Sequence, residues 1–138
     1  MNCTQSDTEE LISLYYEAFN RNDGNGMLRL LCEEVVHGVN QGEEVIGREA
    51  FSHFLAHMDN CYEEQVEDLV VLVNSTGERA AAEFYIRGRY IGTDEGLPEA
   101  TGQAYILRVG AFFELSEGHI ARVTNYYNMQ DWIRQISA

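Results

Sequence analysis

Two histidines four residues apart are the first feature of the sequence that could do chemistry. His53 and His57 fall in a segment whose apolar residues recur at helical spacing, so both imidazoles could reach one metal ion. Asp59 and Cys61 follow closely. The glutamate of the H-E-x-x-H metalloprotease motif is missing after His53, and the sequence indicates no third ligand. We therefore expect a structural or solvent-facing pair, and predict neither a metal nor a cofactor.

A tyrosine near the start of the chain could donate a hydrogen bond to a developing negative charge. Tyr15 lies in an apolar stripe over 11–19, which follows Ser6 and Glu9 at the spacing of a helix capping box. Such a tyrosine either packs in the core or presents its hydroxyl to a cavity, and both alternatives stay open. All nine basic residues are arginines, so Schiff-base chemistry on a lysine side chain and the Walker phosphate loop are excluded.

Composition and charge narrow the class of protein. With 138 residues, 45% of them hydrophobic, and one proline, the chain fits a single domain over 1–138 with a proper core. A net charge of −14 argues against nucleic-acid and membrane partners. There is no apolar run of membrane-spanning length, and the polar, acidic start does not resemble a signal peptide, so we expect a cytoplasmic protein. Three irregularly spaced cysteines, Cys3, Cys32 and Cys61, fit reduced thiols.

Helical periodicity in the first half gives way to alternation of apolar and polar residues in the second. We predict helices from Ser6, over 27–32, over 48–58 and from Met129. Strands are predicted over 34–39, 66–73, 79–91, 102–115 and 119–127, and the last four pair antiparallel because their connections are sequential. This order predicts an α+β fold in which a curved antiparallel sheet wraps around a long helix and encloses a cone-shaped pocket.

Alternation along the strand over 79–91 separates two faces. An apolar set is expected to face the pocket: Ala82, Phe84, Ile86 and Tyr90. A mixed aromatic and charged set is expected on the outside: Glu83, Tyr85, Arg87 and Arg89. That outer composition is typical of a surface that pairs with another protein, with a solvated face as the alternative.

The layout and several local motifs together resemble one superfamily. The motifs are Leu14–Asn20 followed by Asp23, Val35–His37 before Gly42, Ile46–Ala50, Phe112–Leu115 with Gly118–Ile120, and Tyr126–Asn128. In order and spacing they resemble the nuclear-transport-factor-2-like superfamily, and within it the ketosteroid isomerases and SnoaL-type polyketide cyclases. This fold hosts isomerases, cyclases, hydrolases and binding modules alike. The resemblance also implies a homodimer formed through the outer face of the sheet.

Few of the catalytic groups of these relatives are present at the matching positions of this chain. The resemblance retains the isomerase tyrosine as Tyr15, but it aligns the aspartate base with Gly38 and the neutral acid with Gly110. The epoxide hydrolases of this fold carry an arginine and two acids where this chain has Arg108, Gly110 and Asn125. His37, beside the base position, becomes the leading candidate base. The alternative is that His37 points away from position 38 and merely caps the core.

Strand parity and the resemblance together assign a pocket wall. Its predicted members are Phe54, His57, Met58, Phe84, Ile86, Arg108, Phe112, Asn125 and Tyr127. Glu114 shares the parity of Arg108 and Phe112, or lies at the open rim. The glycine-rich loop over 92–101 suits a flap over the pocket, with an ordinary solvated loop as the alternative.

Two functions follow from these residues. The first is a cofactor-independent, isomerase-like or cyclase-like enzyme that transfers a proton on an apolar carbonyl compound, with Tyr15 and His37 as catalytic residues. Arg108 or Asn125 would help to hold negative charge. The second is a non-catalytic module that binds a hydrophobic ligand or serves as a structural dimer. The missing carboxylates favour the second, whereas the retained Tyr15 and His37 favour the first.

Overall fold

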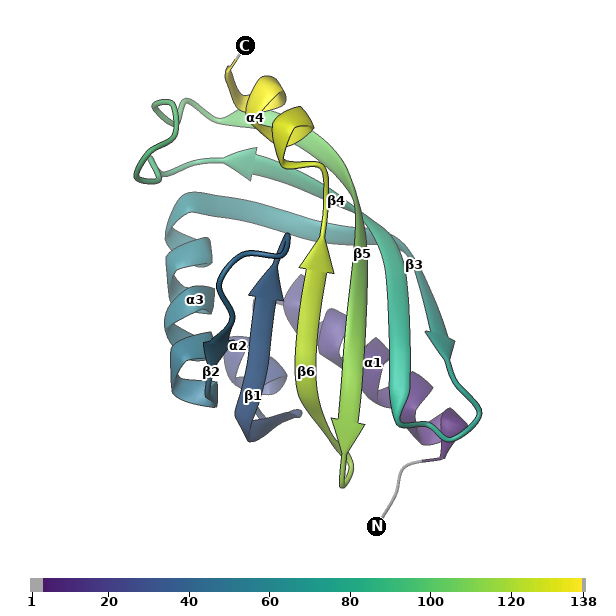
Figure 1. The fold of residues 1–138 in the computed structure, drawn as a ribbon. Helices are drawn as coiled ribbons and strands as arrows, with labels where there is room; N and C mark the ends of the chain where they lie inside the picture. The colour runs from purple at the N-terminus through teal and green to yellow at the C-terminus, as the bar shows by residue number, and fades with distance from the viewer. Residues whose placement is uncertain (1–3, 138) are drawn as a thin grey trace.

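The computed structural model describes residues 4–137, which form four helices and six strands (Figure 1). In chain order these are α1 (Gln5–Asn20), α2 (Gly24–Leu28), β1 (Leu31–Val39), β2 (Val45–Ile46), α3 (Arg48–Cys61), β3 (Tyr62–Val73), β4 (Arg79–Tyr90), β5 (Gln103–Ser116), β6 (His119–Tyr126) and α4 (Met129–Ser137). The predicted α+β class is confirmed. Cys3 lies outside the described residues, and Cys32 and Cys61 are free thiols.

The strands form one open, curved sheet in the order β2-β1-β6-β5-β4-β3. The last four strands in the sequence pair antiparallel with their neighbours, as predicted. β1 lies parallel to β6, and the two-residue β2 pairs with its outer edge. The sequence did not predict β2, which is too short to show an alternating pattern.

Two helix starts differ from the prediction. The capping box is formed by Thr4 and Asp7 rather than by Ser6 and Glu9, with the Asp7 amide donating to Thr4 Oγ1 over 3.1 Å. The second helix begins at Gly24 and ends at Leu28, because the Asp23 carboxylate accepts the Gly26 amide and starts the helix early. The predicted helix over 27–32 was wrong at both ends, because the helix starts three residues earlier and the chain enters β1 at Leu31.

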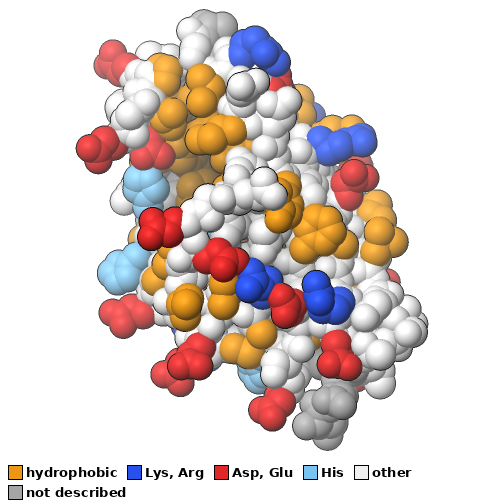
Figure 2. Space-filling view, in the orientation of Figure 1, with side chains coloured by type: hydrophobic (Ala, Val, Ile, Leu, Met, Phe, Trp, Pro, Cys, Tyr) orange, Lys and Arg blue, Asp and Glu red, His pale blue; other side chains and the backbone are white. Residues whose placement is uncertain are grey.

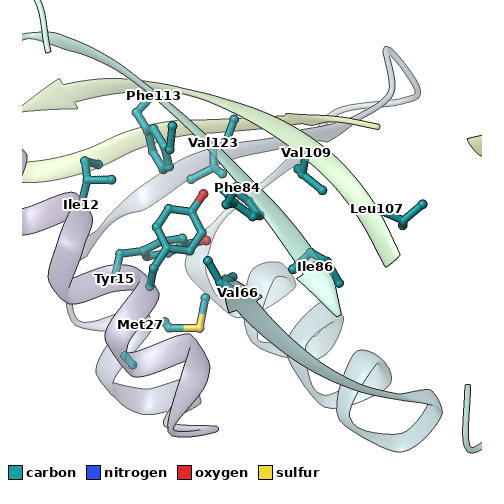
Figure 3. Packing of buried hydrophobic residues seen from close by; sticks show 14 of the residues in the cluster. Ile12, Tyr15, Met27, Val66, Phe84, Ile86, Leu107, Val109, Phe113 and Val123 are labelled. Carbon is teal, nitrogen blue, oxygen red and sulfur yellow. The ribbon is translucent and has the colours of Figure 1, made fainter. Parts of the chain in front are cut away.

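α1 lies behind the sheet in the view of Figure 1 and packs against its concave face. The space between them holds apolar side chains from both layers, among them Ile12, Phe84, Phe113 and Val123 (Figure 3). Phe113 is 1% exposed, and its replacement by alanine would cost about 3–5 kcal/mol of stability. The predicted parity of β4 is confirmed, because Ala82, Phe84, Ile86 and Tyr90 are all buried.

The opposite face of the sheet carries a mixed surface. Figure 2 shows hydrophobic side chains between arginines and carboxylates on this side of the molecule. Large apolar residues exposed on β5 and β6 include Ile106, Phe112 and Tyr126. Within the described part of the chain, no helix has both the length and the apolar character needed to cross a membrane.

Candidate functional site

A cavity of about 460 Å³ lies between the helices and the concave face of the sheet. Its walls are mainly aromatic and aliphatic side chains from α1, α3 and the strands. Figure 3 shows some of them, among them Tyr15 on α1 and Phe84 and Ile86 on β4. The exposed lining residues His57, Asp59 and Glu95 mark its opening. The size and apolar lining suit one small organic molecule.

His37 faces this cavity from β1. It is 6% exposed, and its ring packs against Phe51 and Phe54 of α3 with centroid separations of 4.7 and 4.6 Å. We find no hydrogen bond to either ring nitrogen from residues 4–137. Burial lowers the pKa of His37 below its ordinary value, because the apolar surroundings disfavour the charged ring. The imidazole is therefore neutral at pH 7 and able to accept a proton.

Tyr15 reaches the same cavity from α1. It is 4% exposed and packs edge-on against Phe113, with 5.9 Å between ring centroids. Its hydroxyl has no hydrogen-bond partner in the described chain, and burial raises its pKa, so it stays a neutral donor. The adjacent Tyr16 also lines the cavity, but its hydroxyl is fully covered and finds no hydrogen-bond partner in the described part of the chain.

The sheet register places His37 in one lateral row with Phe113, the residue that the Tyr15 ring contacts. Val123 of β6 pairs with His37 on one side and with Phe113 on the other. Laterally paired residues point to the same face, so these three side chains form a row across three strands, with outer Cα atoms about 10 Å apart. Because Tyr15 contacts Phe113, a base and a hydrogen-bond donor lie at the two ends of this row.

Sequence reasoning missed Glu64. β3 follows α3 without a turn and begins at Tyr62, four residues before its predicted start, so Tyr62, Glu64 and Val66 face inward and all line the cavity. The Tyr105 hydroxyl donates to Glu64 Oε2 over 2.5 Å. Burial raises the pKa of Glu64, an effect that the Tyr105 hydrogen bond partly offsets. The alternation from Tyr62 was the signal that could have found this residue.

A second polar group stands at the opening of the cavity. Asp94, from the loop between β4 and β5, lies 3.0 Å from His57 Nε2 and accepts a 2.6 Å hydrogen bond from the Tyr62 hydroxyl. The Tyr90 hydroxyl accepts the Asp94 amide and donates to the Pro98 carbonyl. The loop over 92–101 is therefore anchored over the opening, whereas its motion as a flap stays a prediction.

The structure brings most of the predicted site residues to one cavity. Its lining includes Tyr15, His37, Phe54, His57, Met58, Phe84, Ile86, Asn125 and Tyr127. His53 does not join His57, because it is exposed and lies 3.9 Å from Glu49.

Arg108 and Phe112 were placed wrongly. β5 has the opposite phase, with Val109 paired to the buried Phe84 and Arg108 paired to Tyr85 on the outer face. Arg108 lies over the Tyr85 ring, 4.8 Å from its centroid, and donates to the Tyr85 hydroxyl. Phe112 is 51% exposed. Glu114 also lies on the outer face of the sheet, where it forms an ion pair with Arg122 and does not line the cavity.

The two positions that the resemblance matched to the isomerase carboxylates were also assigned to the wrong face of the sheet. Gly38 points away from the cavity, since a Cβ there would approach the side chains of Glu44 and Thr124. Gly110 shares the phase of Arg108. The prediction that His37 points opposite to position 38 was right, but the face opposite to Gly38 is the cavity rather than a closed core.

Most of the ionisable side chains in the cavity lining are acidic. Five carboxyl side chains contribute to it, from Asp23, Asp59, Glu64, Asp94 and Glu95. Within residues 4–137 no arginine lines it, and its basic groups are His37 and His57. Such a lining disfavours an anionic ligand.

Comparison with known proteins places the chain in a family. The profile of the SnoaL-like domain matches residues 12–123, and the chain belongs to this family. Its fold is that of the nuclear-transport-factor-2-like superfamily, as the resemblance predicted. No curated protein matches the chain.

Solved structures give closer relatives. A proposed polyketide cyclase from Xanthomonas campestris pv. campestris is 51% identical, with a TM-score of 0.93 over 96% of this chain and 98% of that chain. A second, from Pseudomonas putida KT2440, is 50% identical, with a TM-score of 0.92 over 94% and 97% of the two chains. A phenazine biosynthesis-related protein from Pseudomonas aeruginosa shares the fold at 17% identity, with a TM-score of 0.79 over 96% of this chain and 86% of that chain.

Proposed function

We propose that this chain is an isomerase-like or cyclase-like enzyme that moves a proton between its own side chains and an apolar carbonyl compound. The observation that carries this proposal is the presence, in one apolar cavity, of a neutral imidazole and a hydroxyl that have no hydrogen-bond partner among residues 4–137. The proposed polyketide cyclases, about half identical in sequence, support the same class of chemistry.

In the proposed mechanism His37 removes a proton from the carbon next to the carbonyl group. Tyr15 donates a hydrogen bond to the carbonyl oxygen as negative charge develops there. The protonated His37 then returns the proton. Return to a different carbon gives isomerisation. In a cyclisation the carbanion first attacks a second carbonyl of the same molecule, and the proton goes to the resulting alkoxide.

The lining favours an uncharged substrate. Its carboxyl groups repel carboxylates and phosphates, and its aromatic walls favour a flat apolar body. Asn125, on the wall formed by β6, can hydrogen-bond a polar substituent of such a molecule.

Hydrogen exchange tests this proposal before the natural substrate is known. The protein is incubated in D₂O with a panel of steroid, terpenoid and aromatic polyketide ketones, and deuterium next to the carbonyl is followed by NMR. We expect catalysed exchange for at least one class. His37→Gln and Tyr15→Phe should each lower its rate about a hundredfold or more, whereas the exposed His53→Gln should not change it.

Two other outcomes would contradict the proposal in different ways. Exchange that survives in His37→Gln would remove His37 as the base. Binding of a ketone without exchange would favour the alternative function, a module that holds a hydrophobic ligand without transforming it.

We also propose that a second copy of the chain covers the outer face of the sheet. Phe112 and Tyr126 contact each other there, 5.8 Å between ring centroids, and Phe112 is 51% exposed. Leu72 on β3 is 62% exposed. Exposed apolar side chains next to arginines and glutamates are typical of a homodimer interface.

A further inference from the structure

Three potential metal ligands meet at the opening of the cavity. His57 and Cys61 lie one turn apart at the end of α3, and Asp94 comes from the loop after β4. A ring nitrogen of His57, Sγ of Cys61 and a carboxylate oxygen of Asp94 all lie within 4.8 Å of one another. One of these separations, from His57 Nε2 to Asp94 Oδ1, is 3.0 Å.

Backbone contacts hold two of these ligands together. The amides of Ile91 and Gly92 donate to the Cys61 carbonyl over 2.8 and 3.1 Å, which ties the start of the loop to the end of α3. Gly92 permits this approach, because a Cβ there would lie 2.3 Å from the Asn60 carbonyl oxygen. The separation between Cys61 and Asp94 is therefore set by the fold.

Further hydrogen bonds orient the carboxylate. The Tyr62 hydroxyl donates to Asp94 Oδ2, which leaves Oδ1 toward His57. The Tyr90 hydroxyl accepts the Asp94 amide over 2.9 Å. Hydrogen bonds of this kind to a ligating carboxylate are typical of the surroundings of metal sites.

We propose that His57, Cys61 and Asp94 bind a zinc-type divalent ion at the opening of the cavity. One imidazole, one thiolate and one carboxylate form a donor set that suits zinc. Tetrahedral zinc holds its ligand atoms about 3.5 Å apart, so the His57–Asp94 pair would open slightly, and a separation near the 4.8 Å limit would shorten by about 1 Å. The His57 side chain is 52% exposed and can rotate to do so. Three protein ligands leave a fourth position for water or a ligand oxygen, and His57 and Asp94 both line the cavity.

The structure provides the third metal ligand that the sequence did not indicate. The spacing of His53 and His57 suggested a metal pair, but no third ligand was evident. In the fold His53 lies near Glu49, and His57 instead meets Cys61 and Asp94, which is 37 residues away in the sequence. The site needs neither the proposed base nor the proposed donor, so it stands independently of the proposed reaction.

Cobalt(II) titration of the full chain, after treatment with a chelator, tests the site. We expect one ion per chain, with a thiolate-to-cobalt charge-transfer band and the intense visible bands of tetrahedral cobalt, all abolished by excess zinc. Cys61→Ser should abolish the charge-transfer band. His57→Gln and Asp94→Asn should weaken binding at least about tenfold. His53→Gln and Cys32→Ser serve as matched controls and should bind as the wild type does.

Several results would overturn the proposal. These are the absence of cobalt binding below millimolar concentration, a charge-transfer band that persists in Cys61→Ser, and equal weakening by His53→Gln and His57→Gln. If Cys61→Ser fails to fold, the comparison of the exposed His57 and His53 variants decides. Zinc should also raise the melting temperature of the wild type but not of His57→Gln, through linkage of binding to folding.

Discussion

Tyr105 reaches across the concave face of the sheet to donate a 2.5 Å hydrogen bond to Glu64. The path is open only because residue 88 is a glycine, since a Cβ there would lie 2.4 Å from the Tyr105 ring. Glu64 pairs with Gly88 on β4, and Gly88 pairs with Tyr105 on β5, so the three residues lie in one row. A carboxyl group is thus held in the cavity wall.

Glu64 should make stability fall as pH rises above the ordinary glutamate pKa of about 4.3. Burial raises the pKa of Glu64, so between the ordinary and the raised value the folded state keeps a proton that the unfolded state has lost. Urea unfolding at a series of pH values should show this loss in the wild type, and Glu64→Gln should remove it. Glu63→Gln, on the exposed face of the same strand, is the control. Identical pH profiles for the two variants would contradict the assignment.

His37 should have the opposite effect on the pH dependence of stability. Its pKa is lowered by burial, so below about pH 6.5 the unfolded chain takes up a proton that the folded chain refuses. Stability is unaffected by this group above that pH and is lost as the pH falls toward the lowered pKa. His37→Gln should remove this acid-side loss, and catalysed exchange should decline only at pH values below 6.5. An exchange rate that already halves at pH 7 would be inconsistent with a buried, neutral base.

Tyr15 and Tyr16 form a matched pair of adjacent buried tyrosines. The Tyr16 hydroxyl is covered and unpaired, so Tyr16→Phe should stabilise the fold by about 1 kcal/mol and leave exchange unchanged. Tyr15→Phe should lower exchange about a hundredfold with little change in stability. Denaturant unfolding and the exchange assay measured on both variants separate the two roles. Equal loss of exchange in the two variants would indicate a packing effect rather than hydrogen bonding by Tyr15.

Phe112→Asp tests the proposed homodimer. The side chain is 51% exposed on the outer face, so a charge there should leave the fold intact but disrupt an apolar interface. Sedimentation equilibrium should give twice the chain mass of 15.7 kDa for the wild type and a single chain mass for the variant. A wild-type monomer at micromolar concentration would exclude this interface.

Two neighbouring strands, β4 and β5, differ in how well the sequence predicts their buried faces. Alternation on β4 is unambiguous, because Phe84 and Ile86 alternate with charged or polar neighbours. On β5 two phenylalanines are adjacent, so the apolar pattern alone does not decide whether Phe112 or Phe113 is buried. The resemblance assigned the wrong face of β5 to the cavity. Phe112 and Arg108 were therefore both predicted to line the cavity, although they lie on the outer face.

The candidate site was predictable where it lies on regular elements. Tyr15, His37 and Phe84 lie on α1, β1 and β4, whose apolar faces the sequence shows. Glu64 escaped because the strand was predicted to begin at residue 66, whereas β3 begins at Tyr62 and places Glu64 on its inward face. Asp94 belongs to an irregular loop, and its position depends on a hydrogen bond from Tyr62, 32 residues away in the sequence, that no local pattern encodes.

A crystal structure with bound 2-naphthol would show whether this cavity is a proton-transfer site, because this planar phenol imitates the enolate that proton removal would create. We expect the naphthol to lie in the cavity with its oxygen within hydrogen-bond distance of the Tyr15 hydroxyl and its ring beside His37. A cavity that stays empty at saturating naphthol, or a naphthol oxygen turned away from both residues, would contradict the assignment of this cavity as a proton-transfer site.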